Sequence, residues 1–437
     1  MTPRTTTPRT TTPRPATTDR RTRTVIRRAA TSLVAVAALT AAAACTVPAG
    51  TGTSPGAASP GTASPGAASL GTAPGYAATL RPELERIAED LLVTGGVVLV
   101  RSPELGDWTW VTGSRTRLGN DPVQVGDHVR VGSNTKTWTG TVILQLVQEG
   151  KIALADPVSK YRPEVPGGDR ITIANLLEMR SGLANYTLDV DLNNRGDIYP
   201  TQAWKPEELL AKAFAMPPVA EPGTTFYYSN TNTVLLGLII EQLTGTPVAE
   251  EFQNRLFAPL GMKGTELPDL SSNAMPAPYA RGYTYGTNLG TMYSPVLPDD
   301  VQAAAKAGEI TPMDVTGANP SWAWTAGSGT STAEDLARWV QALVGGGMLN
   351  ADMQRQRLDS LQPSGADPGS AAYGLALARF GPSVYGHTGE LPGYNSFMGY
   401  DPARRITIVT WATPAPAVNG DPPAVELAKA VMGALYS

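Results

Sequence analysis

One stretch, residues 131–150, restricts the fold and the chemistry of this chain more than any other. It reads V-G-S-N-T-K-T-W-T-G-T-V-I-L-Q-L-V-Q-E-G, and its apolar residues at helical spacing predict a buried helix that ends at Gly150. Ser133 and Lys136 lie three residues apart in the first turn, so their side chains share one face. A desolvated lysine can activate a serine hydroxyl, and the helix N-terminus favours developing negative charge. The stretch therefore predicts a nucleophilic serine, although S-x-x-K alone is a weak pattern that also arises by chance.

The first 44 residues predict an export signal. They hold eight arginines and one aspartate, and they end in an apolar run, residues 29–44, that is shorter than the ~20 residues of a membrane span. Cys45 follows A-A-A directly and resembles the lipidation site of bacterial lipoproteins, with Ala42 where that motif usually has leucine. We expect a lipid anchor at Cys45. The alternative is an ordinary signal peptide, or an uncleaved anchor, with an incidental cysteine.

Residues 45–78 predict a disordered tether. They repeat S-P-G-A-A and S-P-G-T-A, which offers too little apolar surface to offset the entropy of ordering. The folded domain is then expected over residues 79–437. We expect a protein that is anchored to the cell membrane and faces the cell wall, or one that is secreted.

Charge and cysteine content exclude two classes of protein. The chain as a whole carries a net charge of −4, and because residues 1–44 are basic, the remainder carries −11. Such an acidic surface repels phosphate backbones, so no nucleic-acid partner is expected. A single cysteine excludes a disulfide-stapled scaffold.

The order of elements in the folded domain predicts an α/β sandwich. Strands are expected near both ends of the domain, so the two ends should share one antiparallel sheet, flanked by helices and carrying an inserted, mainly helical subdomain. Residues 264–320 are rich in glycine, proline and tyrosine, and they predict either a lid over a pocket or a plain surface excursion. The expected strands are residues 95–101, 108–113, 373–380, 383–389, 395–400 and 406–411, and the other expected helices are residues 84–91, 171–179, 207–215, 233–243, 248–257, 332–344 and 424–435.

Two further motifs strengthen the prediction of a nucleophilic serine. Tyr228 and Asn230 form a Y-x-N between a turn and a helix, and His387 begins an H-T-G triplet on an expected strand. Acyl transfer needs these parts: a nucleophile with its lysine, a phenol with an amide, and the edge of a strand. The plainer interpretation of His387 is a strand histidine without a catalytic role. His128, the other histidine, is read as structural.

With these motifs, residues 80–437 resemble the serine beta-lactamase-related and penicillin-binding superfamily, in the branch of class C beta-lactamases, DD-carboxypeptidases and related esterases. The resemblance also covers the stretches R-V-G-S-N-T-K, L-L-E-M-R-S-G-L, Y-Y-S-N-T-N and F-A-P-L-G-M. The H-T-G triplet, in place of K-T-G, makes the chain most similar to secreted actinomycete D-alanyl-D-alanine carboxypeptidases. The implied fold is the beta-lactamase/DD-peptidase fold.

The resemblance implies a role for each motif residue in acylation. Ser133 attacks a carbonyl and becomes acylated, while Lys136 and Tyr228 share the acid and base work, with the sequence leaving open which of them takes the proton. Asn230 is expected to bind the acyl amide of the substrate. The serine and Glu390 contribute the backbone N–H groups of an oxyanion hole, in which one donor is worth about 3 kcal/mol.

The strand motif is expected to contact the leaving group. His387 and Thr388 are implied to orient it, and Gly389, Arg379 and Trp324 are further candidates for substrate contact. If the imidazole must be cationic, activity should fall between about pH 6 and 8.

The expected carboxylate clamp is incomplete in this sequence. In the similar carboxypeptidases an arginine follows Y-G-L-G-L directly, whereas here Ala378 stands there and Arg379 comes one residue later. A one-residue shift in a strand turns a side chain to the other face, and Glu390 after H-T-G would repel a substrate carboxylate.

Several functions therefore stay open. The first hypothesis is a DD-carboxypeptidase-like hydrolase of peptidoglycan peptides, and the second is a beta-lactamase, or an esterase or amidase, of the same fold. A non-catalytic lipoprotein that binds the cell wall is the third. The expected partners are small peptide, ester or beta-lactam substrates, and no cofactor or metal is expected, because two distant histidines and one cysteine make no ligand set. Oligomeric state is not readable from the sequence.

Overall fold

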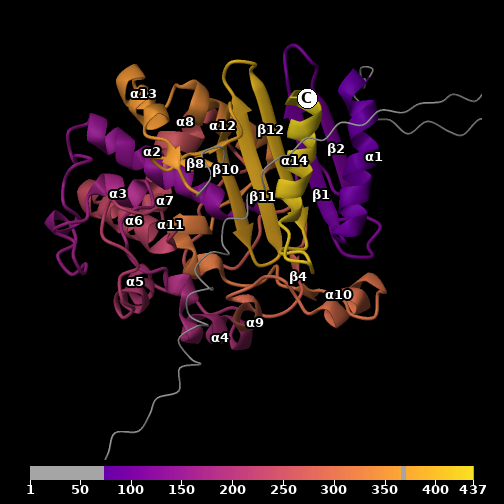
Figure 1. The fold of residues 1–437 in the computed structure, drawn as a ribbon, viewed down its shortest axis with the longest axis horizontal. Coiled ribbons are helices and arrows are strands. Elements are labelled where there is room, and N and C mark those ends of the chain that lie inside the picture. Colours follow the sequence, from indigo (N-terminus) through magenta and orange to yellow (C-terminus); the bar gives the residue numbers. More distant parts are fainter. Residues whose placement is uncertain (1–72, 366–370, 437) are drawn as a thin grey trace, which may run out of the picture. The chain divides into compact units, whose positions relative to one another are not determined.

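The structure, a computed structural model, describes residues 73–365 and 371–436 (Figure 1). The predictions of an export signal, of a lipid anchor at Cys45 and of nearly the whole tether lie outside the described residues. The first element is α1, Gly75–Asp90, so regular structure begins a few residues before the expected start of the folded domain.

The centre of the domain is an eight-stranded antiparallel sheet with the order β2-β1-β12-β11-β10-β9-β8-β7 (Figure 1). Because β1 pairs with β12, the two ends of the domain share one sheet, as the sequence predicted. The strands are β1 Gly95–Arg101, β2 Trp108–Gly113, β7 Gln362–Pro363, β8 Ala372–Tyr373, β9 Ala378–Phe380, β10 Val384–Leu391, β11 Tyr394–Asp401 and β12 Ile406–Thr413.

Two helices, α1 and α14, Pro423–Tyr436, cover one face of the sheet (Figure 1). Successive strand residues point to opposite faces, so Val98 and Val100 pack against these helices while Val97 and Leu99 pack against the other layer. All four are buried, and β1 therefore reads as a continuous apolar run rather than an alternating one.

A larger helical layer covers the other face. Its core contains α2, Thr135–Gln148, α6, Asn230–Thr244, and α12, Ala333–Gly345. The remaining helices are α3 Ile173–Leu177, α4 Val190–Ile198, α5 Pro206–Phe214, α7 Val248–Phe252, α8 Ala258–Leu260, α9 Asn288–Thr291, α10 Asp299–Lys306, α11 Trp324–Gly327 and α13 Ala351–Asp359, and the short strands are β3 Val129–Arg130, β4 Tyr283–Thr284, β5 Met313–Asp314 and β6 Thr330–Ser331. The predicted α/β sandwich with an inserted helical subdomain is confirmed.

The predicted single strand over residues 373–380 is wrong, because residues 374–377 leave the sheet and separate β8 from β9. Ala376 has a φ of +52°, and its N–H donates to the Leu177 carbonyl oxygen at 3.0 Å. A Cβ on Gly140 of α2 would lie 2.2 Å from the Ala376 Cβ, so only glycine allows this approach. The loop therefore packs on the nucleophile's helix, which strand periodicity cannot reveal.

Residues 264–320 form short elements joined by loops. The buried Arg130 holds the end of this segment, because its Nη2 donates to the carbonyl oxygens of Thr316 at 3.1 Å and Ala318 at 2.9 Å. Within the segment, α10 was not predicted, since D-D-V-Q-A-A-A-K offers little apolar surface. The lid stays a prediction.

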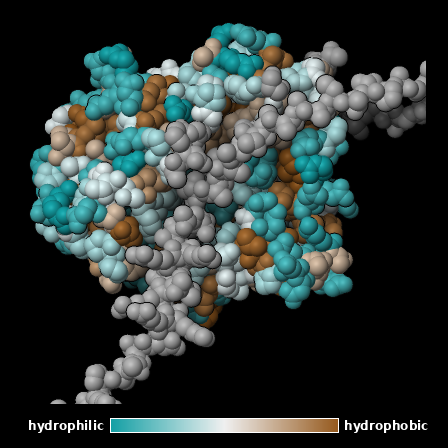
Figure 2. Space-filling model, viewed as in Figure 1, coloured by the Kyte–Doolittle hydropathy of each residue, from teal (hydrophilic) through white to brown (hydrophobic). Residues whose placement is uncertain are grey.

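The face seen in Figure 2 carries its hydrophobic residues in small groups between hydrophilic ones. The most exposed large apolar side chain among the described residues, Leu118, is 86% exposed and lies in a turn after β2. Within the described residues, no helix has both the length and the apolar character that a membrane span requires.

Candidate active site

The predicted nucleophile lies on a tight turn that leads into α2. Residues Gly132–Asn134 form one turn of 3₁₀ helix, and α2 begins at the next residue, so Ser133 precedes the α-helix instead of lying inside it. Gly132 has a φ of +54°, and a Cβ there would lie 2.3 Å from the Glu390 backbone nitrogen. This glycine lets the turn of Ser133 touch the edge of β10.

Lys136 is fully buried in the first turn of α2, and its Nζ contacts three oxygens. It lies 2.8 Å from Ser133 Oγ, 2.7 Å from Asn230 Oδ1 and 2.6 Å from the Ala326 carbonyl oxygen. The amide and carbonyl oxygens can only accept, so they take two N–H bonds of the lysine. The remaining tetrahedral position of the Lys136 Nζ, which holds the lone pair when the amine is neutral, faces the Ser133 hydroxyl.

The protonation state of Lys136 follows from its burial. Desolvation holds its pKa well below the usual value, and no carboxylate is among the causes of the shift. A neutral amine in this geometry directs its lone pair at Ser133, whose O–H can then donate to it. Lys136 is thus arranged as a general base.

The Tyr228 phenol is half-buried on the other side of the serine. Burial raises its pKa, although a hydrogen bond with the Ser133 side chain lowers it. The phenol therefore stays protonated at neutral pH and can act as an acid. Lys136 Nζ lies 4.9 Å from the centroid of this ring, which brings the two acid–base groups together around one hydroxyl.

Asn230 is the first residue of α6 and is fixed by an asparagine that sequence reasoning missed. Asn185 Oδ1 accepts from the backbone N–H of Asn230 at 3.2 Å and lies 3.4 Å from its Nδ2. This contact directs Asn230 Oδ1 toward Lys136. The signal available in the sequence was an asparagine two residues after the quoted R-S-G-L. Its burial is visible only in the structure.

The edge of β10 borders the nucleophile. Its pairing with β9 ends at Gly386, so His387 and the following residues extend past the neighbouring strand. A Cβ on Gly389 would lie 1.9 Å from the Val131 carbonyl oxygen, which explains the glycine of H-T-G. The two backbones approach closely enough for the N–H groups of Ser133 and Glu390 to serve one oxyanion.

His387 is buried and makes two hydrogen bonds within the protein. Its Nε2 lies 3.1 Å from the Tyr373 hydroxyl, and its Nδ1 lies 2.5 Å from the Thr388 carbonyl oxygen. Desolvation, the largest cause, lowers its pKa to about 3, and the charge of Lys136 contributes in the same direction. The pKa favours a neutral imidazole, so a cationic His387, the condition for the expected loss of activity between pH 6 and 8, is not supported. Tyr373, from the quoted Y-G-L stretch, was missed as a site residue.

Thr388 and Glu390 point to the sheet face opposite His387, because side chains alternate along β10. Glu390 reaches solvent, and its Oε2 accepts from Asn395 Nδ2 at 3.0 Å. Desolvation raises the pKa of Glu390 to about 7, and no charged neighbour among the described residues contributes. Since solvent reaches it, the carboxyl still ionises near neutral pH.

The position of the expected arginine clamp is apolar. Ala378 pairs with Gly386 and lies in a hydrophobic cluster with Met179, Tyr373 and Tyr228. Arg379 pairs with Tyr385, so it lies one residue, about 3 Å, along the strand from Ala378, and its side chain points to the opposite face. Arg379 does not occupy the clamp position.

Trp324 does not line the site as expected. It is 5% exposed in the helical core, at a φ of +33°, and its ring packs over Gly237 of α6. Its role is to support α11, whose Ala326 carbonyl oxygen accepts from Lys136.

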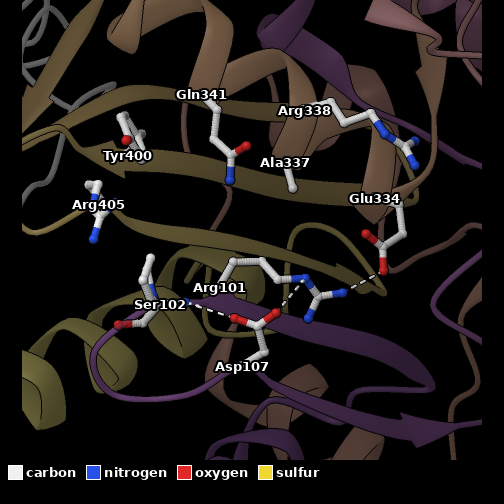
Figure 3. Close-up of a pocket in the computed structure, with 10 residues that line it drawn as sticks. Arg101, Ser102, Asp107, Glu334, Ala337, Arg338, Gln341, Tyr400 and Arg405 are labelled. Atoms are coloured by element: carbon white, nitrogen blue, oxygen red, sulfur yellow. Dashed lines mark hydrogen bonds and ion pairs between the residues drawn. The ribbon is translucent and has the colours of Figure 1, made fainter.

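A cavity of about 560 Å³ lies apart from these residues (Figure 3). Arg101 crosses it to form ion pairs with Glu334 at 2.6 Å and Asp107 at 3.6 Å. Gln341 and Tyr400 also line it, and it shares no residue with the serine cluster. Among residues 73–365 and 371–436, no group of three or more His, Cys, Asp or Glu side chains is placed to hold a metal ion.

An antiparallel sheet beside a helical layer, with a serine, a buried lysine and a phenol at their junction, defines a class of serine hydrolases. The chain belongs to the beta-lactamase family, whose model matches residues 84–430.

Three known proteins illustrate this membership. A putative penicillin-binding protein PbpX of Bacillus subtilis is 26% identical over 64% of this chain, which spans only 61% of that protein's length. A putative D-alanyl-D-alanine carboxypeptidase of Salmonella agona is 26% identical over 64% of this chain and 67% of its own length. The crystal structure of a D-stereospecific amidohydrolase from Streptomyces sp. is similar with a TM-score of 0.68 and 30% identity, over 82% of this chain and 98% of that one.

Proposed function

We propose that this protein hydrolyses amides or esters of D-amino acid derivatives that carry no carboxylate beside the scissile bond. The observation that carries the proposal is the strand side of the site, where apolar Ala378 occupies the clamp position and Arg379 is displaced from it. A substrate carboxylate would find no cationic partner at that position. The D-stereospecific amidohydrolase from Streptomyces sp. supports this substrate class.

Acylation begins with transfer of the Ser133 proton to the neutral Lys136. The serine Oγ bonds to the substrate carbonyl carbon, and the resulting oxyanion is bound by the N–H groups of Ser133 and Glu390. The leaving group takes a proton from Tyr228 as its bond to the carbonyl breaks. The proton held by Lys136 replaces the one that the phenol gave up, so both groups regain their original states.

Deacylation uses the same groups in reverse. Water gives a proton to the base, attacks the acyl carbon and displaces Ser133, whose Oγ takes a proton back. The product acid then leaves.

The second candidate is the D-alanyl-D-alanine carboxypeptidase-like activity suggested by the sequence. The H-T-G triplet and the putative carboxypeptidase of Salmonella agona favour it. This activity requires another group to bind the terminal carboxylate, since Arg379 is displaced from the clamp position.

A substrate panel separates the candidates. The purified chain is given a D-amino acid amide, its L-enantiomer, a nitrophenyl ester, a D-Ala-D-Ala peptide and nitrocefin, with Ser133→Ala as control. We expect faster turnover of the D-amide than of the L-amide or the D-Ala-D-Ala peptide. Faster release of D-alanine supports the second candidate, and rapid nitrocefin turnover supports a beta-lactamase. No turnover, together with no labelling by a fluorescent penicillin or fluorophosphonate, supports a non-catalytic wall-binding protein.

We also propose that the protein acts outside the cytoplasm as a lipoprotein. The basic leader, the apolar run and Cys45 after A-A-A support this location. Labelling of producing cells with a fatty acid should mark the wild-type chain but not Cys45→Ser. Equal labelling, or retention of the wild-type chain in the cytoplasm, contradicts the proposal.

A further inference from the structure

We propose that Tyr373 is a positioning residue that holds His387 as a neutral imidazole with its proton on Nδ1. Both ring nitrogens are then engaged within the protein, so His387 neither donates a proton to the substrate nor binds a substrate carboxylate. The inference deepens the proposed function, on which its consequence for substrate binding rests.

For a neutral ring, the donors and acceptors around His387 admit one arrangement. The Thr388 carbonyl oxygen can only accept, so Nδ1, at 2.5 Å, carries a hydrogen. A neutral ring has one hydrogen on its nitrogens, so Nε2 is the acceptor and the Tyr373 hydroxyl donates to it at 3.1 Å. An imidazolium would require the hydroxyl to turn and accept from Nε2, and burial of the ring disfavours that charged state.

Apart from Lys136, the described groups that face His387 are uncharged at neutral pH. Tyr228 and Tyr373 lie with ring centroids 6.4 Å and 5.6 Å from the imidazole, and neither is charged at neutral pH because burial raises both pKa values. Among the described residues, Lys136 is the group that acts on the ring with a positive charge, and only when it is protonated. Glu390, on the same strand, points to the opposite face. A protonated His387 would oppose the positive charge that Lys136 acquires when it takes the serine proton.

Tyr373 is itself anchored to the nucleophile's helix. Arg357 of α13 is fully buried, with Nε donating to the Leu375 carbonyl oxygen at 3.2 Å and Nη2 to Thr141 Oγ1 of α2 at 2.9 Å. These bonds fasten the loop after Tyr373 to α2. The position of the phenol is therefore tied to the helix that carries Lys136.

The first test observes the tautomer without any substrate. The full-length chain has two histidines, so ¹⁵N-histidine NMR gives two ring signal sets, and His128→Gln assigns them. We expect His387 to show the Nδ1–H tautomer from pH 5 to 8. In Tyr373→Phe we expect the Nε2 signal to shift, because that nitrogen loses its hydrogen-bond donor, and the ring pKa to rise from its low wild-type value. An Nε2–H tautomer or an imidazolium in the wild-type protein at pH 7 overturns the proposal.

The second test separates positioning from a general structural effect. Labelling of Ser133 by a fluorophosphonate should be about fivefold slower in Tyr373→Phe than in wild type from pH 6 to 8, because the imidazole loses one hydrogen bond but stays neutral. Tyr385→Phe is the matched control, because Tyr385 lies on β10 and its hydroxyl bonds to none of the described residues. Unchanged labelling, or slower labelling without a shift of the Nε2 signal, contradicts the proposal. The NMR result stands whatever substrate the enzyme prefers, so failure of the proposed function is recognised separately.

Discussion

The two sides of the active site are built on different principles. On the lysine side, formed by Lys136, Asn230, Asn185 and the Ala326 carbonyl, each polar contact holds the amine toward the serine. On the strand side, formed by Tyr373, Ala378 and His387, apolar and aromatic groups surround a neutral imidazole, and the carboxyl of Glu390 lies on the opposite face of the sheet. The lysine side thus determines the reaction, while the strand side determines which acyl compounds can enter.

The comparison predicts its largest effect at the residue that both sides share. Ser133→Ala should reduce hydrolysis of any accepted substrate by about 10⁴-fold or more, because the nucleophile is lost. Steady-state rates and fluorophosphonate labelling check this, with the exposed Ser271→Ala as control. Residual activity near the wild-type rate would remove the acyl-enzyme from the mechanism.

Loss of the base should have the next largest effect. Lys136→Met should slow acylation by about 10²- to 10⁴-fold, and Lys136→Arg should be equally slow because a guanidinium does not deprotonate. In the wild type, the lowered pKa means that acylation falls as pH decreases through it, since protonated lysine cannot accept a proton. The exposed Lys263→Met should keep the wild-type profile. Activity of the arginine variant would indicate that Tyr228, and not Lys136, is the general base.

A smaller effect is expected on the strand side, where the charge of Glu390 can be removed. Because burial raises its pKa to about 7, the carboxyl is neutral below that pH and charged above it. The ratio of kcat/KM for a D-Ala-D-Ala peptide to that for a D-amino acid amide should therefore fall about tenfold from pH 6 to 8. Glu390→Gln should make this ratio independent of pH. An unchanged slope in the variant would mean that another group repels the carboxylate.

The smallest effect is expected at Asn185, which supports the lysine side indirectly. Asn185→Ala removes the acceptor of the Asn230 amide and should slow acylation about fivefold, the value of one hydrogen bond. Asn185→Asp keeps an acceptor oxygen but adds a negative charge near Lys136, so it should raise the lysine pKa and move the acidic limb of the profile to higher pH. Wild-type behaviour of both variants would show that Asn230 is held without Asn185.

The sequence predicted the lysine side better than the strand side for a physical reason. Ser133 and Lys136 lie three residues apart in the turn that leads into α2, so their spacing alone brings them together, and Tyr228 and Asn230 flank a single helix start. The contact between Tyr373 and His387 depends instead on pairing across β9 and on a loop that leaves the sheet. Such contacts have no local periodicity.

Two other outcomes show the same limit. Trp324 was a candidate for substrate contact, yet packing against Gly237 places it in the core. The ordinary pKa of histidine left a cationic His387 open, whereas burial lowers the pKa of this side chain. Spacing predicts which residues share an element, but not which of them are desolvated.

The pairing of β1 with β12 has a consequence for how the enzyme is made. Thr94 and Thr413, which form a hydrogen bond, are 319 residues apart in the chain. Contacts between residues so far apart in the sequence form slowly, and they form only after the second residue has been synthesised. A polypeptide that ended at Arg405 would contain Ser133 and His387, but it would lack the strand that joins β11 to β1. We expect such a chain to be catalytically silent, so that activity requires β12 to have been synthesised.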